Sequence, residues 1–235
     1  MSDVKEWLYQ QVDMRYQDFS SRITTTGRPI LGIRLPLLHK KAKELAKQYG
    51  YDAYTMIDDT YMEEVLLKGF VLGYTKPVDW SVLMKYIENY ISLTDSWCTV
   101  DTFCSCIRPV VNRNRELFRN FVMSLKEDNR EYVQRYRIVT MMIHFLDDAY
   151  IEESIEEVLA VPLQTYYTDM AKAWFLATAF VSQKEKIKKV CKKSVLGKSV
   201  FTKTCQKLLD SYRVSDADKQ WVRQIRKEEA YEIPD

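Results

Sequence analysis

Residues 95–106 read DSWCTVDTFCSC and place a tryptophan, aspartates and three cysteines within one short stretch. Three interpretations compete, namely a metal site, a redox site and one face of a helix. An α-helix turns by about 100° per residue, so Cys98, Cys104 and Cys106 would point in three separate directions. A single helix therefore cannot bring them together on a metal ion or join two of them in a disulfide. The stretch predicts a helix with its cysteines as small core residues, and a redox role stays an alternative.

Helix start and stop signals recur along the whole chain of 235 residues. Asp, Asn, Ser and Thr often stand where a helix begins, because their side chains accept hydrogen bonds from the first turn. Pro36 suits a first turn and Gly50 suits a helix end. Ser215 and Asp218 form a capping box in front of the last helix. The predicted helices span about 2–22, 36–49, 60–73, 80–91, 97–107, 113–126, 130–146, 151–159, 165–180, 184–193, 199–212 and 216–229.

Composition and spacing favour one packed domain over residues 1–235. Hydrophobic residues make up 46% of the chain, while glycine and proline contribute only 6 residues each. No long linker rich in Pro, Gly or Ser divides the chain. Helix pairs of about 40 residues are typical of HEAT-like repeat proteins with a concave groove. We therefore predict an all-α, HEAT-like helical-repeat α-solenoid, with an irregular helical bundle as the alternative.

Charge is unevenly distributed along the chain, although the formal net charge is only +2. Residues 184–207 contain nine lysines and one acidic residue. Residues 147–157 contain six acidic residues and no basic one. Such asymmetry can mark a side that faces a polyanion, and two solvated helix faces are the alternative.

Apolar runs such as AWFLATAFV at 173–181 are far shorter than the ~20 residues that cross a membrane, so no membrane span is expected. The acidic, amphipathic N-terminus does not resemble a signal peptide. Five cysteines without paired spacing indicate a reduced, cytoplasmic setting. The two histidines, His39 and His144, lie far apart without ligand spacing, so no metal site is predicted.

Trp97 and Asp101 stand four residues apart and would share one face of the predicted helix, which Cys104 continues. An aspartate beside a tryptophan on a packed helix costs free energy unless another group compensates for its charge. One interpretation is an exposed aspartate, or one bonded to a neighbouring helix. The other is an ionised carboxylate in a cleft with an aromatic wall.

Arg135 is a cation that could compensate for such a carboxylate. It lies at the border of an apolar helix stripe, where a neighbouring helix would pack. Trp174 belongs to a segment that is apolar nearly all round, which indicates a buried central helix. Spacing alone does not bring Trp97, Asp101, Arg135 and Trp174 together.

Five of these segments, in this order, resemble the AlkD-type DNA alkylation repair family. The resemblance spans nearly the whole chain, and the ordered set is more specific than any single motif. The segments are LGIRLP at 31–36, SWCTVD at 96–101, YVQRYRIV at 132–139, YYTDMAKAWFLATAFV at 166–181 and LDSYRVSDADKQWVRQIRK at 209–227.

The resemblance implies HEAT-like helix pairs around a basic groove for duplex DNA. Active members are monomeric glycosylases without metal or cofactor, and they release 3-methyladenine and 7-methylguanine. By motif, Asp101 would stabilise positive charge on the deoxyribose or position water. Trp97 and Trp174 would line the cleft, and Arg135 would hold a phosphate. The further residues expected to contact the DNA backbone are Arg34, Lys40, Lys188 and Lys192.

One interval departs from the family pattern. Active AlkD proteins carry an extra helix before LGIRLP that reaches the minor groove, whereas SSRITTTGRPI at 20–30 is a poor helix former. The sequence thus resembles the branch that lacks this helix. We expect a monomer with weak, sequence-independent binding to duplex DNA and weak or absent glycosylase activity. A helical-repeat adaptor for a protein or another polyanion is the alternative function.

Overall fold

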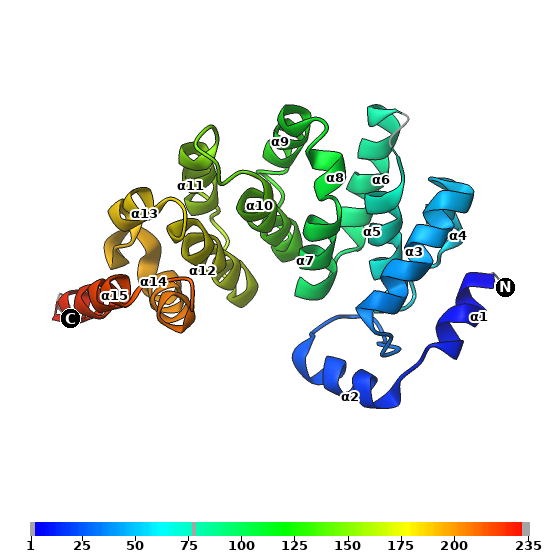
Figure 1. Ribbon diagram of the computed structural model, residues 1–235, viewed down its shortest axis with the longest axis horizontal. Coiled ribbons are helices and arrows are strands. Elements are labelled where there is room, and N and C mark those ends of the chain that lie inside the picture. The colour runs from blue at the N-terminus through cyan, green and yellow to red at the C-terminus, as the bar shows by residue number, and fades with distance from the viewer. Residues whose placement is uncertain (1–2, 77–78, 232–235) are drawn as a thin grey trace. The chain divides into compact units, whose positions relative to one another are not determined.

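The computed structural model describes residues 3–76 and 79–231 and confirms an all-α fold (Figure 1). The described residues form fifteen helices and no strand. In chain order the helices are α1 (Asp3–Gln10), α2 (Met14–Ile23), α3 (Leu35–Tyr49), α4 (Asp52–Met56), α5 (Met62–Tyr74), α6 (Trp80–Leu93), α7 (Trp97–Cys106), α8 (Arg108–Val111), α9 (Arg115–Ser124), α10 (Glu131–His144), α11 (Ile151–Leu159), α12 (Tyr166–Phe180), α13 (Lys184–Val190), α14 (Lys193–Asp210) and α15 (Asp216–Tyr231).

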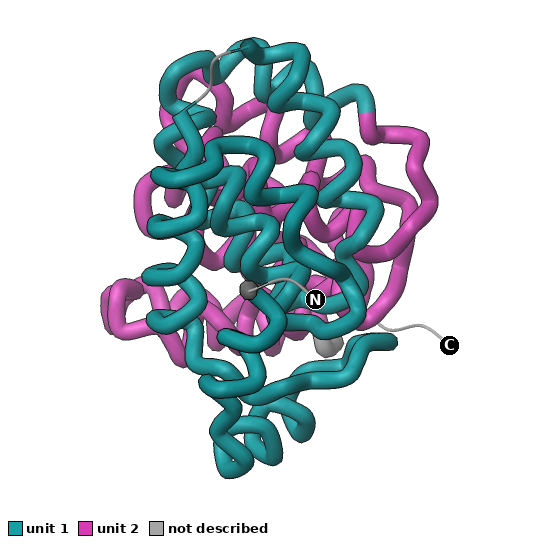
Figure 2. The backbone as a smooth tube through the Cα atoms, turned by 90° about the vertical axis from the view of Figure 1, so that its right-hand side faces the viewer, with its two compact units in different colours: residues 1–124 teal, residues 125–235 magenta. Residues whose placement is uncertain are grey.

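The chain forms two compact units, residues 1–124 and residues 125–235 (Figure 2). In the first unit, α5 packs between α3 and α7, and α4, α6 and α8 also contact α5. In the second unit, α12 packs between α10 and α14, while α11, α13 and α15 each pack on one of these three helices. Both units therefore repeat one plan of consecutive inner helices, each packed against further partner helices, which is a helical-repeat fold. The HEAT-like class and the single domain stay predictions.

The core of the first unit lies between α1, α3 and α5. Its members are buried aliphatic and aromatic side chains, among them Leu8, Leu38 and Phe70. Fully burying a side chain of this size contributes about 1.5–3 kcal/mol, so the core supplies most of the stability of these helices. None of the helices within residues 3–76 and 79–231 combines the length and apolar character that a membrane crossing needs.

Most helix boundaries lie where local signals predict them. Asp79 accepts a hydrogen bond from the Ser81 amide at 2.7 Å and starts α6. Ser96 starts α7, Thr165 starts α12 and Ser215 accepts from the Asp218 amide at the start of α15. Gly50 ends α3 with a positive φ of 57°, which glycine adopts without steric cost. The short helices α4 and α8 were not predicted. Gly197 is non-helical, with φ 73° and ψ 157°, and divides α14 into two parts, the second of which begins where the helix at 199–212 was predicted.

The prediction of one helix from Ser2 to Arg22 was wrong. Asp13 has extended backbone angles, and its carboxylate accepts hydrogen bonds from the amides of Arg15 and Tyr16, both at 3.1 Å. It therefore caps a new helix, α2, after α1 has ended. The interval 20–30 contributes four residues to α2, and residues 24–30 are not helical. A separate helix, α2, thus precedes residues 24–30, and the resemblance to the branch without the extra helix stays a prediction.

Polar contacts hold α2, since Ser20 is its one buried residue. At its start, Asp13 pairs with Arg34, whose NH2 atom lies 2.9 Å from the carboxylate. The Gln17 amide donates to the Ile30 carbonyl at 2.6 Å. At its end, the Trp97 indole donates to the Ile23 carbonyl at 3.1 Å. The helix is therefore fixed at both ends to the chain segments that lead into α3 and α7.

Gly32 allows α2 to approach the LGIRLP segment closely. Its φ is 83°, and an added Cβ would lie 2.5 Å from the Cβ of Gln17. Gly32→Ala should therefore cost about 1–3 kcal/mol of unfolding free energy, the range for a side chain in a strained backbone region. Urea unfolding measures this loss. Gly50→Ala is the matched control, because its φ is also positive but nothing lies within 4 Å of the added Cβ; an equal loss in both variants would exclude a role for the contact with α2.

Candidate nucleic-acid interface

Trp97 and Asp101 lie one turn apart on α7, and both side chains are half-buried. Ser96 caps the helix by accepting from the Thr99 amide at 3.3 Å, which starts α7 directly at Trp97. The Trp97 ring is oriented by the hydrogen bond from its indole nitrogen to Ile23. The two predicted residues therefore share one partly exposed face of α7, which begins beside the end of α2.

Asp95, which stands in front of α7, is a further polar residue of this region that no local pattern assigns to the site. Its Oδ2 atom accepts from the Thr26 hydroxyl at 2.9 Å and from the Gly27 amide at 3.0 Å. The Arg28 guanidinium lies 2.8 Å from the same atom. Asp95, two residues before Trp97, thus holds the TTTGR loop at 24–28 in place. The local sequence shows only an aspartate next to a helix start. Its hydrogen-bond partners, Gly27 and Thr26, lie 68 and 69 residues away along the chain.

The three cysteines of α7 are buried or half-buried in the described structure. Cys98 and Cys106 are half-buried free thiols, and Cys104 is fully buried. Burial, followed by the charge of Asp101, raises the pKa of Cys98 to about 12. Burial likewise raises the pKa of Cys106 to about 11. Thiols with such pKa values stay protonated and unreactive at neutral pH, which supports their interpretation as packing residues.

Arg135 lies on α10 in the second unit and is only 6% exposed. Its NH1 atom donates to the Tyr167 carbonyl at 2.8 Å. On the same helix, the Glu131 carboxylate accepts from the Tyr167 amide at 3.2 Å and from the Thr165 hydroxyl. Both residues therefore join α10 to the first turn of α12. The guanidinium that was expected to hold a phosphate is engaged, at least in part, within the protein.

Trp174 lies on α12, is 36% exposed and lines a cavity of about 390 Å³ within the second unit. The other lining residues come from α12, from the end of α14 and from the segment that follows it. They are Ala177, Thr178, Val181, Lys207, Asp210, Ser211, Tyr212 and Arg213. The cavity thus combines an indole wall with two basic side chains and one carboxylate, that of Asp210. The sequence places Tyr212 and Arg213 only in the C-terminal motif at 209–227, because no short-range pattern connects these residues to Trp174.

The four predicted backbone contacts have different surroundings. Arg34 stacks on Tyr16 with 4.8 Å between its guanidinium carbon and the ring centroid, besides pairing with Asp13. Lys40 and Lys192 are exposed on α3 and at the start of α14. Lys188 forms ion pairs with two carboxylates of the second unit, at 3.2 Å from Glu185 and 4.0 Å from Asp218. All four assignments stay predictions, and Lys188 would have to exchange these partners for a phosphate.

The predicted cleft residues are divided between the two units. Trp97 and Asp101 belong to the first unit, and Arg135 and Trp174 belong to the second. The meeting of all four in one cleft therefore stays a prediction. Within residues 3–76 and 79–231, no group of three or more His, Cys, Asp or Glu residues is placed to hold a metal ion.

Comparison with known proteins relates the chain to one protein family. The profile of the family described as "DNA alkylation repair enzyme" matches residues 4–163. The matched part contains Trp97, Asp101 and Arg135, whereas Trp174 and its cavity lie beyond it. No curated protein and no solved structure matches the chain. The match covers more than half of the 235 residues, and the chain belongs to the DNA alkylation repair enzyme family.

Proposed function

We propose that this protein binds duplex DNA weakly and without sequence preference, as a monomer. We further propose that it releases cationic alkylpurines such as 3-methyladenine and 7-methylguanine slowly or not at all. The observation that carries this proposal is the pair Trp97 and Asp101, which lies half-exposed on one face of α7 in a member of this family. Trp174, with Lys207 and Arg213 beside it, supports a second contact region.

The residue types suit hydrolysis of a glycosidic bond to a cationic base. Such a base is already a good leaving group, so no general acid is required. The departing base leaves positive charge on the deoxyribose. A fixed carboxylate such as that of Asp101 would stabilise this charge or direct a water molecule to the sugar. An aromatic face beside the cation, from Trp97 or Trp174, contributes roughly 0.5–2 kcal/mol. No metal or cofactor takes part in this scheme.

The structure adds a second reason for expecting low activity. The first is the poor helix-forming interval 20–30, of which residues 24–30 are not helical, although α2 precedes them. The stronger argument is Arg135, which is 6% exposed and donates to the Tyr167 carbonyl. A guanidinium that is engaged within the protein positions a phosphate poorly. Displacement of a substrate by even about 1 Å can cost roughly a hundredfold in rate.

A helical-repeat adaptor is the second candidate function, and α2 carries the observation that favours it. Met14, Phe19 and Ile23 are large apolar side chains on this helix, and all three are exposed. Apolar groups gathered on one exposed helix are typical of a surface that contacts a partner. In this case the predicted concave groove would bind a protein or another polyanion instead of DNA, and we would expect tight binding to a protein.

The test measures release of 7-methylguanine from methylated duplex DNA by the native protein and by Asp101→Asn. We expect release near background in both, together with duplex binding in the micromolar range or weaker, as is typical of non-specific binding. Affinity should fall with salt, with a logarithmic slope of about −0.9 per neutralised phosphate. Efficient excision that Asp101→Asn abolishes would contradict the expected low activity. DNA binding that is independent of salt would contradict the proposed mode of binding.

A further inference from the structure

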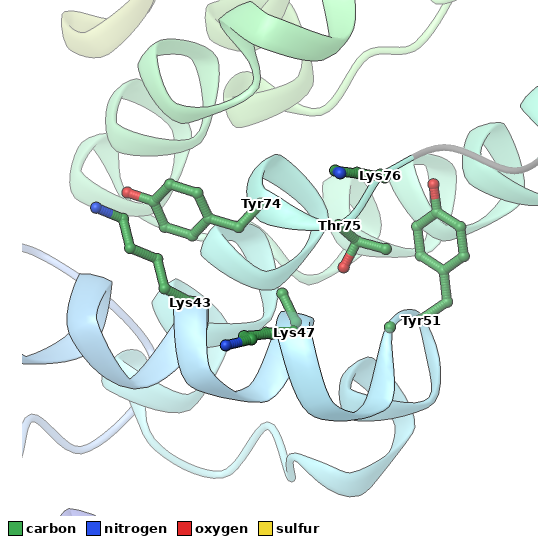
Figure 3. Close-up of a pocket in the computed structure, with 8 residues that line it drawn as sticks. Lys43, Lys47, Tyr51, Tyr74, Thr75 and Lys76 are labelled. Atoms are coloured by element: carbon green, nitrogen blue, oxygen red, sulfur yellow. The ribbon is translucent and has the colours of Figure 1, made fainter.

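A second basic cavity lies in the first unit, between the carboxyl-terminal parts of α3 and α5. It encloses about 560 Å³, within the range typical of small-molecule sites. Figure 3 shows Lys43 and Lys47 on α3, Tyr74, Thr75 and Lys76 at the end of α5, and Tyr51 beyond α3. Ala46 and Gly50 complete the described lining.

The cavity is positively charged. Of the described residues that line it, three are lysines and none is acidic. None of these lysines forms an ion pair with a described carboxylate. Some lysines elsewhere in the chain are paired, for example Lys5 with Asp58 at 3.1 Å and Lys184 with Asp218 at 2.7 Å. The three lysines thus give the cavity lining a positive charge, and an anion bound there would be attracted to it.

The aromatic wall of the cavity is held in place by its neighbours. The Tyr74 hydroxyl and the His39 Nδ1 atom are hydrogen-bonded at 2.8 Å, and the His39 ring stacks on Phe70 with centroids 3.8 Å apart. The Lys43 ammonium lies 5.1 Å from the centroid of the Tyr74 ring. On the far side, Tyr51 stacks on Tyr86 with centroids 5.4 Å apart. A rigid wall of this kind limits the entropy that binding would cost.

The helix dipole explains only part of this lysine cluster. The carboxyl end of a helix favours a cation by about 0.3–1 kcal/mol, and the effect is confined to the last turn. Lys47 lies in the last turn of α3 and is accounted for in this way. Lys43 lies earlier in α3, and Lys76 lies outside the helix altogether. Their convergence on one cavity therefore requires another reason.

We propose that this cavity binds a phosphate group of the bound nucleic acid, as a site separate from the Trp97–Asp101 face. The inference rests on the proposed DNA binding. Lysine binds phosphate as a mobile point charge, and three lysines suit the spread of charge over its oxygens. The cavity lies near Cys106 at the end of α7, because Gly73, the neighbour of the lining residue Tyr74, packs on Cys106. Trp97 lies at the start of α7, so the two sites are separated by roughly 15 Å along this ten-residue helix.

The test compares charge reversals in the full-length protein. Lys43→Glu and Lys76→Glu alter the cavity, and Lys85→Glu is the matched control on α6, where the lysine is also exposed. The titrations use a short duplex DNA, a mononucleotide and inorganic phosphate, and thermal unfolding checks the fold of each variant. We expect about a tenfold loss of duplex affinity in both cavity variants, as for the loss of a charge-assisted hydrogen bond. The salt slope should fall by about one phosphate, and Lys85→Glu should change neither quantity.

The outcomes separate this site from the proposed function. Equal duplex affinity in Lys43→Glu, Lys76→Glu and Lys85→Glu would overturn the phosphate site even if the protein binds DNA. If the native protein fails to bind duplex DNA but binds the mononucleotide or phosphate, and Lys43→Glu removes that binding, the phosphate site stands and the DNA function falls. Binding of none of the three probes would overturn both.

Discussion

Glu63→Gln should destabilise the protein by about 3 kcal/mol, because Glu63 closes the LGIRLP segment onto α5. Glu63 is 1% exposed. Its Oε1 atom accepts from the amides of Gly32 and Ile33 at 2.7 and 3.3 Å, and its Oε2 atom accepts from the Leu31 amide at 2.9 Å. Hydrogen bonds to a charged group contribute about 1.5–3 kcal/mol, and glutamine would direct an N–H donor at one of these amides. Urea unfolding with an unchanged slope measures the loss.

Glu64→Gln is the matched control, since Glu64 is the next residue and is also 1% exposed. Only its Oε2 atom accepts a backbone hydrogen bond, from Tyr61 at 2.9 Å. The amide oxygen of glutamine can replace that acceptor, so we expect a loss of about 1 kcal/mol or less. Similar losses in the two variants would show that burial of the charge, rather than the three amides, determines the effect.

Arg137→Met should cost about 3 kcal/mol in the second unit, because it leaves a partly buried carboxylate without its nearest cation. Arg137 is 3% exposed, and its NH2 atom lies 2.8 Å from Oε2 of Glu157. Its NH1 atom donates to the Gln134 side chain at 2.7 Å. Burial lowers the pKa of Arg137, and the charge of Glu157 opposes this shift. The pair joins α10, which also carries Arg135, to α11, so thermal and urea unfolding should both report the loss.

Lys126→Met provides the comparison, because Lys126 contacts the same carboxylate from an exposed position at 3.6 Å. Exposed ion pairs contribute about 0–1 kcal/mol, so this variant should stay close to the native stability. Adding Glu157→Gln to Arg137→Met should recover part of the loss, since it removes the uncompensated charge. If the double variant is less stable than Arg137→Met alone, the uncompensated charge is not the cause of the loss.

Trp97 and Asp101 were predictable from spacing within one helix, whereas the surroundings of Trp97 were not. The i and i+4 positions share a face in any α-helix, so α7 brings the two residues together as expected. The indole partner, the Ile23 carbonyl, lies 74 residues away along the chain, and no local pattern indicates it. The same holds for Asp95, whose partners in the TTTGR loop were read only as a poor helix.

The LGIRLP motif shows how a local pattern and a tertiary contact combine. Its sequence marks a family resemblance and the start of α3, but it does not say what the first three residues do. In the structure their amides all point at one buried carboxylate from α5, about 30 residues later. The first three residues of the motif therefore donate their amides to the Glu63 carboxylate, and Gly32 among them is where α2 packs closely.

Helix existence and most helix ends follow from short-range physics, because capping side chains, glycine and proline act within one turn of their own position. This is why the predicted helix starts at 80, at 97 and near 165, and the predicted helix end at Gly50, agree with the structure. Asp13 is also a local helix cap, but the amphipathic pattern continues across it, so the sequence predicted one helix where α1 and α2 are separate. The two basic cavities, the exposure of α2 and the engagement of Arg135 depend on which helices pack together. Packing sums many weak contacts between distant segments, so only the tertiary structure decides which charges are buried, paired or left facing a cavity.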